Sequence, residues 1–238
     1  MRQHSLLALD GSAGYRSYWT LLISVQMGAL LLALFCPPAT AQSDAVRDRA
    51  VRIVALGDSL TAGLGLPLGA AFPARLEAAL KARGIVTEIA NAGVSGDTAS
   101  RGLARLAWSV PEGTDAVIVE LGANDMLLGI DPAITREALA EIVRRLIGRG
   151  IFVLLAGMRA APNLGPEYGR KFEAIFPELA VKNDLLIYPF FLDGVATDAT
   201  LNQPDGLHPN AAGVDVIVSR MLPIVEELIA RVKRRRPA

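Results

Sequence analysis

From residue 51 onward, short apolar runs alternate with longer amphipathic segments. Five runs rich in Val, Ile and Leu predict β-strands at residues 51–56, 86–90, 116–121, 151–156 and 185–188. They lack strict alternation of apolar and polar positions, which is typical of strands buried on both faces of a sheet. Apolar positions at helical spacing predict helices over residues 72–83, 98–108, 134–149, 167–182 and 210–233. This alternation predicts one α/β domain built on a parallel sheet.

Local signals mark the ends of several predicted helices. Gly84 and Gly150 directly follow two of them, where a left-handed C-cap favours glycine. Asp97-Thr98 and Asp131-Pro132 are good helix starts, because they combine a capping side chain with a residue that tolerates the first turn. Pro223 lies inside the last predicted helix, and its missing N–H predicts a kink or break there.

The N-terminal region has the pattern of an export signal. Residues 21–35 form a predominantly apolar run, preceded by Arg2 and Arg16 and followed by Ala39-Thr40-Ala41. This order predicts a secretory signal peptide in residues 1–41, cleaved after Ala41. The run is short for a transmembrane helix, which needs about 20 residues, and a retained N-terminal anchor is the alternative. We expect residues 42–50 to be a flexible lead-in and the mature protein to be periplasmic or secreted.

The composition of the chain argues against several classes of protein and of binding site. The 238 residues include 24 Lys and Arg against 24 Asp and Glu, a balance that argues against nucleic-acid binding. A hydrophobic content of 52% excludes an intrinsically disordered chain. One cysteine and two histidines offer neither an internal disulfide nor a zinc site, and we expect no metal and no cofactor. Because His4 falls in the predicted signal, any imidazole chemistry must use His208.

Polar, glycine-bearing segments follow three of the predicted strands and precede the last helix. They are Gly57-Asp58-Ser59-Leu60-Thr61, Asn91-Ala92-Gly93-Val94-Ser95-Gly96, Gly122-Ala123-Asn124-Asp125 and Asp205-Gly206-Leu207-His208-Pro209. In a parallel α/β sheet, ligands bind outside the carboxyl ends of the strands. We therefore expect the four segments to meet at one rim and to form an active site.

Nucleophilic catalysis assigns roles to three of these residues. A serine hydroxyl needs a base, and His208 is the imidazole available to activate Ser59. Asp205, three residues before His208, is spaced to orient that imidazole and to stabilise its charged form. Asp193 and Asp198 lack this close spacing. Each residue also has a structural interpretation, because Ser59 is a good helix N-cap and Asp205 and His208 fit a turn.

An oxyanion hole requires hydrogen-bond donors beside the nucleophile. The backbone N–H groups of Ser59 and Gly93 and the side-chain amide of Asn124 are the candidates. Glycine at position 93 would let the backbone approach a substrate closely. Asn124 has the alternative of stabilising a loop. We interpret Asp58 and Asp125 as structural supports of the loop geometry rather than as groups that react.

Together the four segments resemble the sequence blocks of the GDSL, or SGNH, hydrolase superfamily. The resemblance spans residues 51–210 and implies a flavodoxin-like three-layer αβα sandwich with a five-stranded parallel sheet. It also implies that Ser59, Asp205 and His208 form a catalytic triad and that Ser59, Gly93 and Asn124 form the oxyanion hole. Gly57-Asp-Ser-Leu-Thr-Ala-Gly63 and Met158-Arg-Ala-Ala-Pro-Asn-Leu-Gly-Pro-Glu-Tyr168 are similar to the bacterial arylesterase, lysophospholipase and acyl-CoA thioesterase branch.

This resemblance implies a serine esterase that acts on small-molecule acyl esters through an acyl-enzyme, without a cofactor. Aryl esters, lysophospholipids and acyl thioesters are the implied substrates. One alternative is a carbohydrate O-acetyl esterase, and another is a non-catalytic binding module on the same fold. We expect the hydrolase domain to span residues 51–230, followed by a basic tail at residues 231–238. The tail is either a solvated end or a peripheral contact with an anionic membrane.

Overall fold

The computed structural model describes residues 49–235. It confirms the predicted five-stranded parallel sheet, whose strands lie in the order β2-β1-β3-β4-β5. The strands are β1 (Val51–Gly57), β2 (Thr87–Gly93), β3 (Ala116–Glu120), β4 (Phe152–Ala156) and β5 (Leu186–Tyr188). The strand order reverses between β1 and β3, and in doubly wound sheets the ligand crevice opens at this point.

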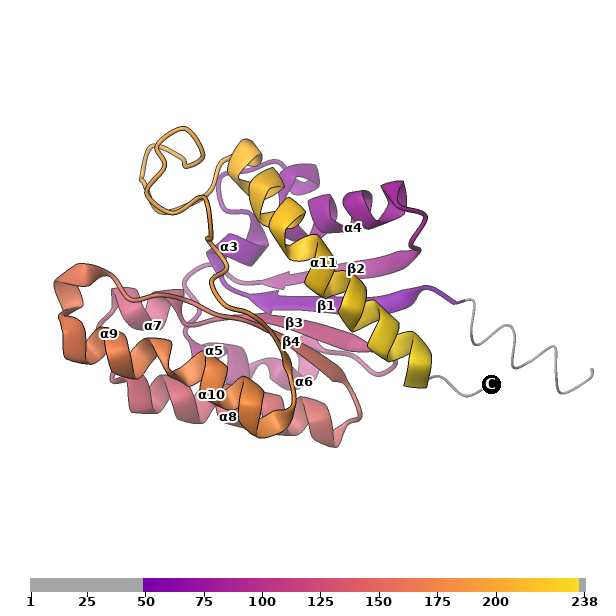
Figure 1. The fold of residues 1–238 in the computed structure, drawn as a ribbon, viewed down its shortest axis with the longest axis horizontal. Coiled ribbons are helices and arrows are strands. Elements are labelled where there is room, and N and C mark those ends of the chain that lie inside the picture. The colour runs from indigo at the N-terminus through magenta and orange to yellow at the C-terminus, as the bar shows by residue number, and fades with distance from the viewer. Residues whose placement is uncertain (1–48, 236–238) are drawn as a thin grey trace, which may run out of the picture. The chain divides into compact units, whose positions relative to one another are not determined.

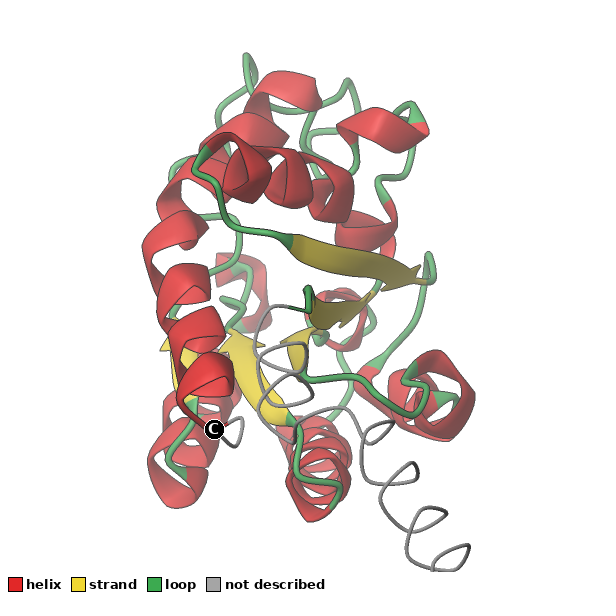
Figure 2. Cartoon of the chain, turned by 90° about the vertical axis from the view of Figure 1, so that its right-hand side faces the viewer, coloured by secondary structure: helices red, strands yellow, loops and turns green. Residues whose placement is uncertain are grey.

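Helices cover both faces of the sheet and give the predicted αβα sandwich (Figures 1 and 2). Helices α4 (Phe72–Ala82) and α11 (Ala211–Arg235) lie on one face. Helices α5 (Ala99–Ala104), α8 (Pro132–Gly148) and α10 (Ile175–Asn183) lie on the other. Shorter helices occupy the connections: α3 (Ser59–Ala62), α6 (Leu106–Ser109), α7 (Ala123–Leu127), α9 (Pro166–Glu173) and the 3-10 turns Leu68–Ala70 and Pro162–Leu164.

The core lies between the central strands and the two helical layers. Every residue of β3 is buried, and β1 is buried except for Arg52. Strand β2 forms an edge of the sheet and exposes much of its length, so the expectation of burial on both faces is wrong for this strand. Gly57 at the end of β1 pairs with Gly93 of β2 and Glu120 of β3, which places the three strand ends level.

Two predicted helices are each divided in the structure. The segment 98–108 forms α5 and α6, which meet at Arg105, whose buried side chain turns toward the ends of the strands. The segment 167–182 forms α9 and α10, which meet at Ala174. Pro177 explains the second division, because it has no N–H to donate to the carbonyl of Glu173 and its ring clashes there.

The last helix differs from its prediction in two respects. Of the kink or break predicted at Pro223, the break is wrong, because helix α11 runs continuously across this residue. It also continues to Arg235, so the first five residues of the expected tail are helical. Arg231 and Arg234 both pair with Glu227, and the Arg235 guanidinium lies 4.0 Å from the centre of the Phe152 ring. These contacts tie the basic segment to the domain.

The predicted signal peptide, residues 1–41, lies outside the described residues, as does most of the lead-in. Within the lead-in, Arg49 forms an ion pair with Asp115, with its Nη2 2.6 Å from Oδ1. Strand β1 begins at Val51, as predicted. Between residues 49 and 235, no helix is both long enough and apolar enough to cross a membrane.

Candidate active site

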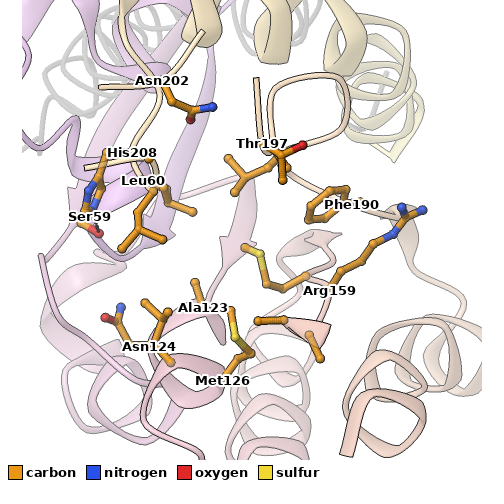
Figure 3. Close-up of a pocket in the computed structure, with 18 of the residues that line it drawn as sticks. Ser59, Leu60, Ala123, Asn124, Met126, Arg159, Phe190, Thr197, Asn202 and His208 are labelled. Atoms are coloured by element: carbon orange, nitrogen blue, oxygen red, sulfur yellow. Dashed lines mark hydrogen bonds between the residues drawn. The ribbon is translucent and has the colours of Figure 1, made fainter. Parts of the chain in front are cut away.

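The four polar segments meet at the carboxyl edge of the sheet, beside the point where the strand order reverses. They contribute to a pocket of about 480 Å³. Ser59 lies in α3 directly after β1, Asn124 lies in α7 directly after β3, and His208 lies in the loop that leads to α11. Figure 3 shows Ser59 and His208 side by side at one end of the pocket, with Asn124 nearby.

Ser59, His208 and Asp205 form a continuous chain of hydrogen bonds. The Oγ of Ser59 lies 2.9 Å from Nε2 of His208, and Nδ1 of the same ring lies 2.6 Å from Oδ2 of Asp205. The other carboxylate oxygen of Asp205 accepts the backbone N–H groups of Leu207 and His208. The N–H bonds from His208 and Leu207 lower the pKa of Asp205 to about 2, so this carboxylate stays ionised near neutral pH.

The turn between β1 and α3 holds Ser59 at the pocket. Asp58 is the N-cap of α3, and its Oδ1 accepts the Leu60 N–H at 3.0 Å. Ser59 is therefore the first residue of the helix, and the alternative interpretation of Ser59 as the N-cap is wrong. Gly57 permits this turn to close, because a Cβ there would lie 2.0 Å from Oγ1 of Thr61.

Asn124 is tied to the two neighbouring segments. Its Nδ2 donates to Oδ2 of Asp58 and to the carbonyl oxygen of Asp97, both at 3.0 Å. Asp58 is fully buried, and this burial raises its pKa to about 6. Asp125 accepts the Ala99 N–H at 2.8 Å and the Thr135 hydroxyl at 2.9 Å. Asp58 and Asp125 thus each accept hydrogen bonds from two neighbouring groups.

Gly93 does not reach the pocket. Its N–H donates to Oδ1 of Asn91 at 2.9 Å, and a Cβ at this position would lie 2.2 Å from the Ala62 nitrogen. The structure thus gives Gly93 a packing role between β2 and α3, and it does not support the expected role as an oxyanion donor. Gly96 lines the pocket instead, and its N–H has no hydrogen-bond acceptor between residues 49 and 235. Sequence spacing could not separate these two glycines.

Arg105 is a buried residue that the sequence analysis did not identify. Its Nε lies 2.5 Å from Oδ2 of Asp97, and both side chains are more than nine-tenths buried. Its two Nη atoms donate to the carbonyl oxygens of Ala92 and Gly57, each at 2.8 Å. Arg105 therefore joins the end of β1, the end of β2 and the loop that carries Gly96. In the sequence it resembles any surface arginine of an amphipathic helix.

The two other candidate acids have different partners. Asp193 accepts from the Arg220 guanidinium, and Asp198 accepts from the Thr200 hydroxyl at 2.7 Å. Neither shares a hydrogen bond with His208 among the described residues, so Asp205 is the carboxylate that faces the imidazole.

Most of the pocket wall is apolar. Its far end, opposite Ser59, is formed by Phe190 and Arg159, whose guanidinium lies 4.8 Å from the centre of the Phe190 ring (Figure 3). The remaining side chains of the wall are mainly Leu, Met and Ala. Within residues 49–235, no three His, Cys, Asp or Glu side chains gather in a way that would suit a metal ion.

Comparison with known proteins assigns the family. Residues 55–216 match the family model of the GDSL-like lipase/acylhydrolase family. The crystal structure of AlinE4, an SGNH-hydrolase family esterase, is 47% identical, with a TM-score of 0.64 over 75% of this chain and 96% of that one. The chain thus belongs to the GDSL-like lipase/acylhydrolase family, and it is an esterase.

Two characterised relatives extend the comparison. An arylesterase from Vibrio mimicus is 36% identical over 75% of this chain and 87% of its own length. A protein from Escherichia coli strain K12, named thioesterase 1/protease 1/lysophospholipase L1, is 35% identical over 74% of this chain and 84% of its own length. The predicted resemblance is therefore confirmed at the level of the family.

Proposed function

We propose that this esterase cleaves acyl esters through a covalent acyl-enzyme on Ser59. His208 takes the Ser59 proton as Oγ attacks the carbonyl carbon, and it then protonates the leaving alcohol. Water, activated by the same imidazole, releases the acid and restores the Ser59 hydroxyl. The observation that carries this proposal is the hydrogen-bonded chain from Ser59 Oγ through His208 to Asp205, with links of 2.9 and 2.6 Å.

The developing oxyanion would be stabilised by donors at the start of α3 and beside it. The Ser59 N–H belongs to the first residue of α3 and has no acceptor within residues 49–235. We assign the second backbone donor to Gly96, because its N–H is uncommitted and the residue lines the pocket. The Asn124 amide is the third donor, in accordance with its position next to both segments.

We propose aryl esters, lysophospholipids and acyl thioesters as the substrate classes. An apolar pocket of about 480 Å³ suits an acyl chain or an aromatic ring, since each buries apolar surface there. The names of the two characterised relatives indicate the same classes. An acetyl group on a carbohydrate would leave most of this apolar wall without contact, which argues against the carbohydrate esterase alternative.

A chain-length series tests this proposal. We expect p-nitrophenyl esters from acetate to decanoate to be hydrolysed, with kcat/KM rising as the acyl chain gains contact with the pocket wall. Lysophosphatidylcholine, an acyl-CoA and acetylated xylan would then be compared at equal concentration. Activity confined to acetylated xylan would contradict the proposed substrates, and a lack of any turnover would support the binding-module alternative.

We also propose that the protein is exported, on the strength of the pattern in residues 1–41. The expected mature N-terminus is Gln42, directly after Ala39-Thr40-Ala41. Mass spectrometry of protein recovered from the periplasm or medium identifies this terminus. Recovery of intact residues 1–41 from the membrane fraction would instead favour the retained anchor.

A further inference from the structure

Glu120, the last residue of β3, is a buried carboxyl group directly beneath the turn that carries Ser59. Its exposed fraction is 1%. Its Oε2 accepts the Thr61 hydroxyl at 2.7 Å and the Asp58 backbone N–H at 3.4 Å. Both partners lie within two residues of Ser59, one on each side of it. The other oxygen, Oε1, is buried and has no hydrogen-bond partner among the described residues.

The neighbouring strand leaves room for this carboxyl group. Gly57 pairs with Glu120 across the sheet, and a Cβ on Gly57 would lie 2.6 Å from Oε2 of Glu120. The same Cβ would lie 2.0 Å from Oγ1 of Thr61. A side chain at position 57 would therefore displace both members of the hydrogen bond, so the glycine, the threonine and the glutamate fit together as one unit.

The charges around Glu120 do not favour a carboxylate. The negative charge of Asp58 would repel an ionised Glu120. The Arg105 guanidinium, which also reaches the end of β1, is bound to Asp97 and to the carbonyl of Gly57. No Lys, Arg or His between residues 49 and 235 forms an ion pair with Glu120. An ionised Glu120 would bury an unpaired anionic oxygen, which is costly, and burial accordingly raises its pKa well above the usual range.

We propose that Glu120 is a positioning residue that works as an uncharged acid. Its Oε2 holds the Thr61 hydroxyl and the Asp58 N–H, and it thereby fixes the turn that keeps Ser59 Oγ in line with His208. It touches neither the substrate nor the reacting atoms. This inference rests on the proposed role of Ser59 and adds the residue that maintains its geometry.

The test compares Glu120→Ala with Glu120→Gln, because the amide oxygen of glutamine can accept the same two hydrogen bonds without a charge. We expect Glu120→Ala to lower kcat by about 10- to 100-fold with KM little changed, since a small misplacement of the nucleophile is enough for such a loss. Glu120→Gln should restore most of the lost kcat. The Tm of Glu120→Gln at pH 7.5 should be at least that of the wild type. A glutamine does not have to take up a proton on folding, as a glutamate with a raised pKa does.

Thr61→Val provides a second variant that leaves the buried carboxyl in place. It removes one donor to Oε2 and should lower kcat in the same direction as Glu120→Ala, which keeps the proposal testable if the alanine variant does not fold. If a folded Glu120→Gln protein lost as much kcat as Glu120→Ala, the proposal that Glu120 works without a charge would be overturned. Unchanged kcat in a folded Glu120→Ala protein would overturn the positioning role.

Labelling with a fluorophosphonate separates this inference from the proposed function. A wild-type protein that is labelled at Ser59, together with a Glu120→Ala protein labelled at the same rate, contradicts only the role of Glu120. A wild-type protein that is not labelled at Ser59 contradicts the proposed nucleophile itself.

Discussion

Asn124 donates from Nδ2 to Oδ2 of Asp58 at 3.0 Å, and this bond joins the segment after β3 to the residue that precedes Ser59. The second hydrogen of the same amide is directed to the Asp97 carbonyl oxygen, also at 3.0 Å. Both Asn124 donors are thus engaged, whereas the N–H groups of Ser59 and Gly96 have no acceptor in the described part of the chain. A bound oxyanion would share an Asn124 hydrogen with one of these two acceptors.

The first prediction concerns this amide. Asn124→Ala should lower kcat by roughly 10²–10³ and leave KM nearly unchanged, because a donor to the oxyanion matters most once charge develops on the substrate. Asn183→Ala is the matched control, since the side chain of Asn183 in α10 donates to the Leu179 carbonyl of its own helix and has no other hydrogen bond between residues 49 and 235. Steady-state kinetics on the same ester decide the matter. A rise in KM at constant kcat would make Asn124 a residue of ground-state binding.

The second prediction separates the two glycines. Gly93→Ala should lower the Tm strongly, because the added Cβ would collide with the backbone of α3. Gly96→Ala meets no atom within 4 Å, but its φ of +83° is strained for alanine, so the backbone and its N–H should shift. Its main effect should be a loss of kcat. Thermal denaturation and kinetics on both variants test the assignment, and the reverse pattern would return the oxyanion role to Gly93.

The glycines also show where the sequence was informative about the site and where it was not. The polar segments that follow the predicted strands, together with the Asp-x-x-His spacing, indicate Ser59, Asp205, His208 and Asn124 as candidate site residues without coordinates. Gly93 ends β2 and Gly96 lies in the loop that follows it. Only their arrangement in space shows that the Gly93 N–H is bound to Asn91, whereas the Gly96 N–H is free to donate at the pocket. Position along the sequence contains no such information.

The residues that the sequence analysis missed are buried polar groups with long-range partners. Glu120 ends a strand of apolar residues and is followed by Leu121, so the apolar pattern passes over it. Arg105 lies in a segment of helical spacing, and its buried contacts with Gly57 and Ala92 exist only after the strands have assembled. The division at Arg105 likewise depends on long-range contacts, whereas the division at Ala174 has a local cause in Pro177.

The third prediction concerns the nucleophile. Ser59→Ala should abolish labelling by a fluorophosphonate and reduce kcat by several orders of magnitude, because it removes the hydroxyl proposed to form the acyl-enzyme. The circular dichroism spectrum and the Tm should change little, since Ser59 is not the cap of α3. Ser95→Ala is the matched control, because Ser95 lines the same pocket. Persistent labelling of the Ser59→Ala protein would place the nucleophile elsewhere.

The last prediction concerns the pH dependence of activity, which we expect to depend on Asp58 as well as on His208. His208 must be neutral to accept the Ser59 proton, so activity falls as the imidazole is protonated. Asp58, with its pKa raised by burial to about 6, also takes up a proton as the pH falls, which weakens its bonds from Asn124 and Leu60. Asp205, with its pKa lowered to about 2, stays ionised throughout.

We therefore expect the acid limb of log kcat/KM to approach a slope of two in the wild type and one in Asp58→Asn. Stability should respond in the opposite sense. Because the folded pKa of Asp58 exceeds its unfolded value of about 3.8, the folded state binds more protons between about pH 4 and 6, and the contribution of Asp58 to the free energy of unfolding grows as the pH falls through that window. Urea denaturation at pH 7 and pH 5 measures this gain, which Asp58→Asn should remove. Equal slopes of one in both proteins, with equal stability changes, would show that Asp58 does not titrate in this range.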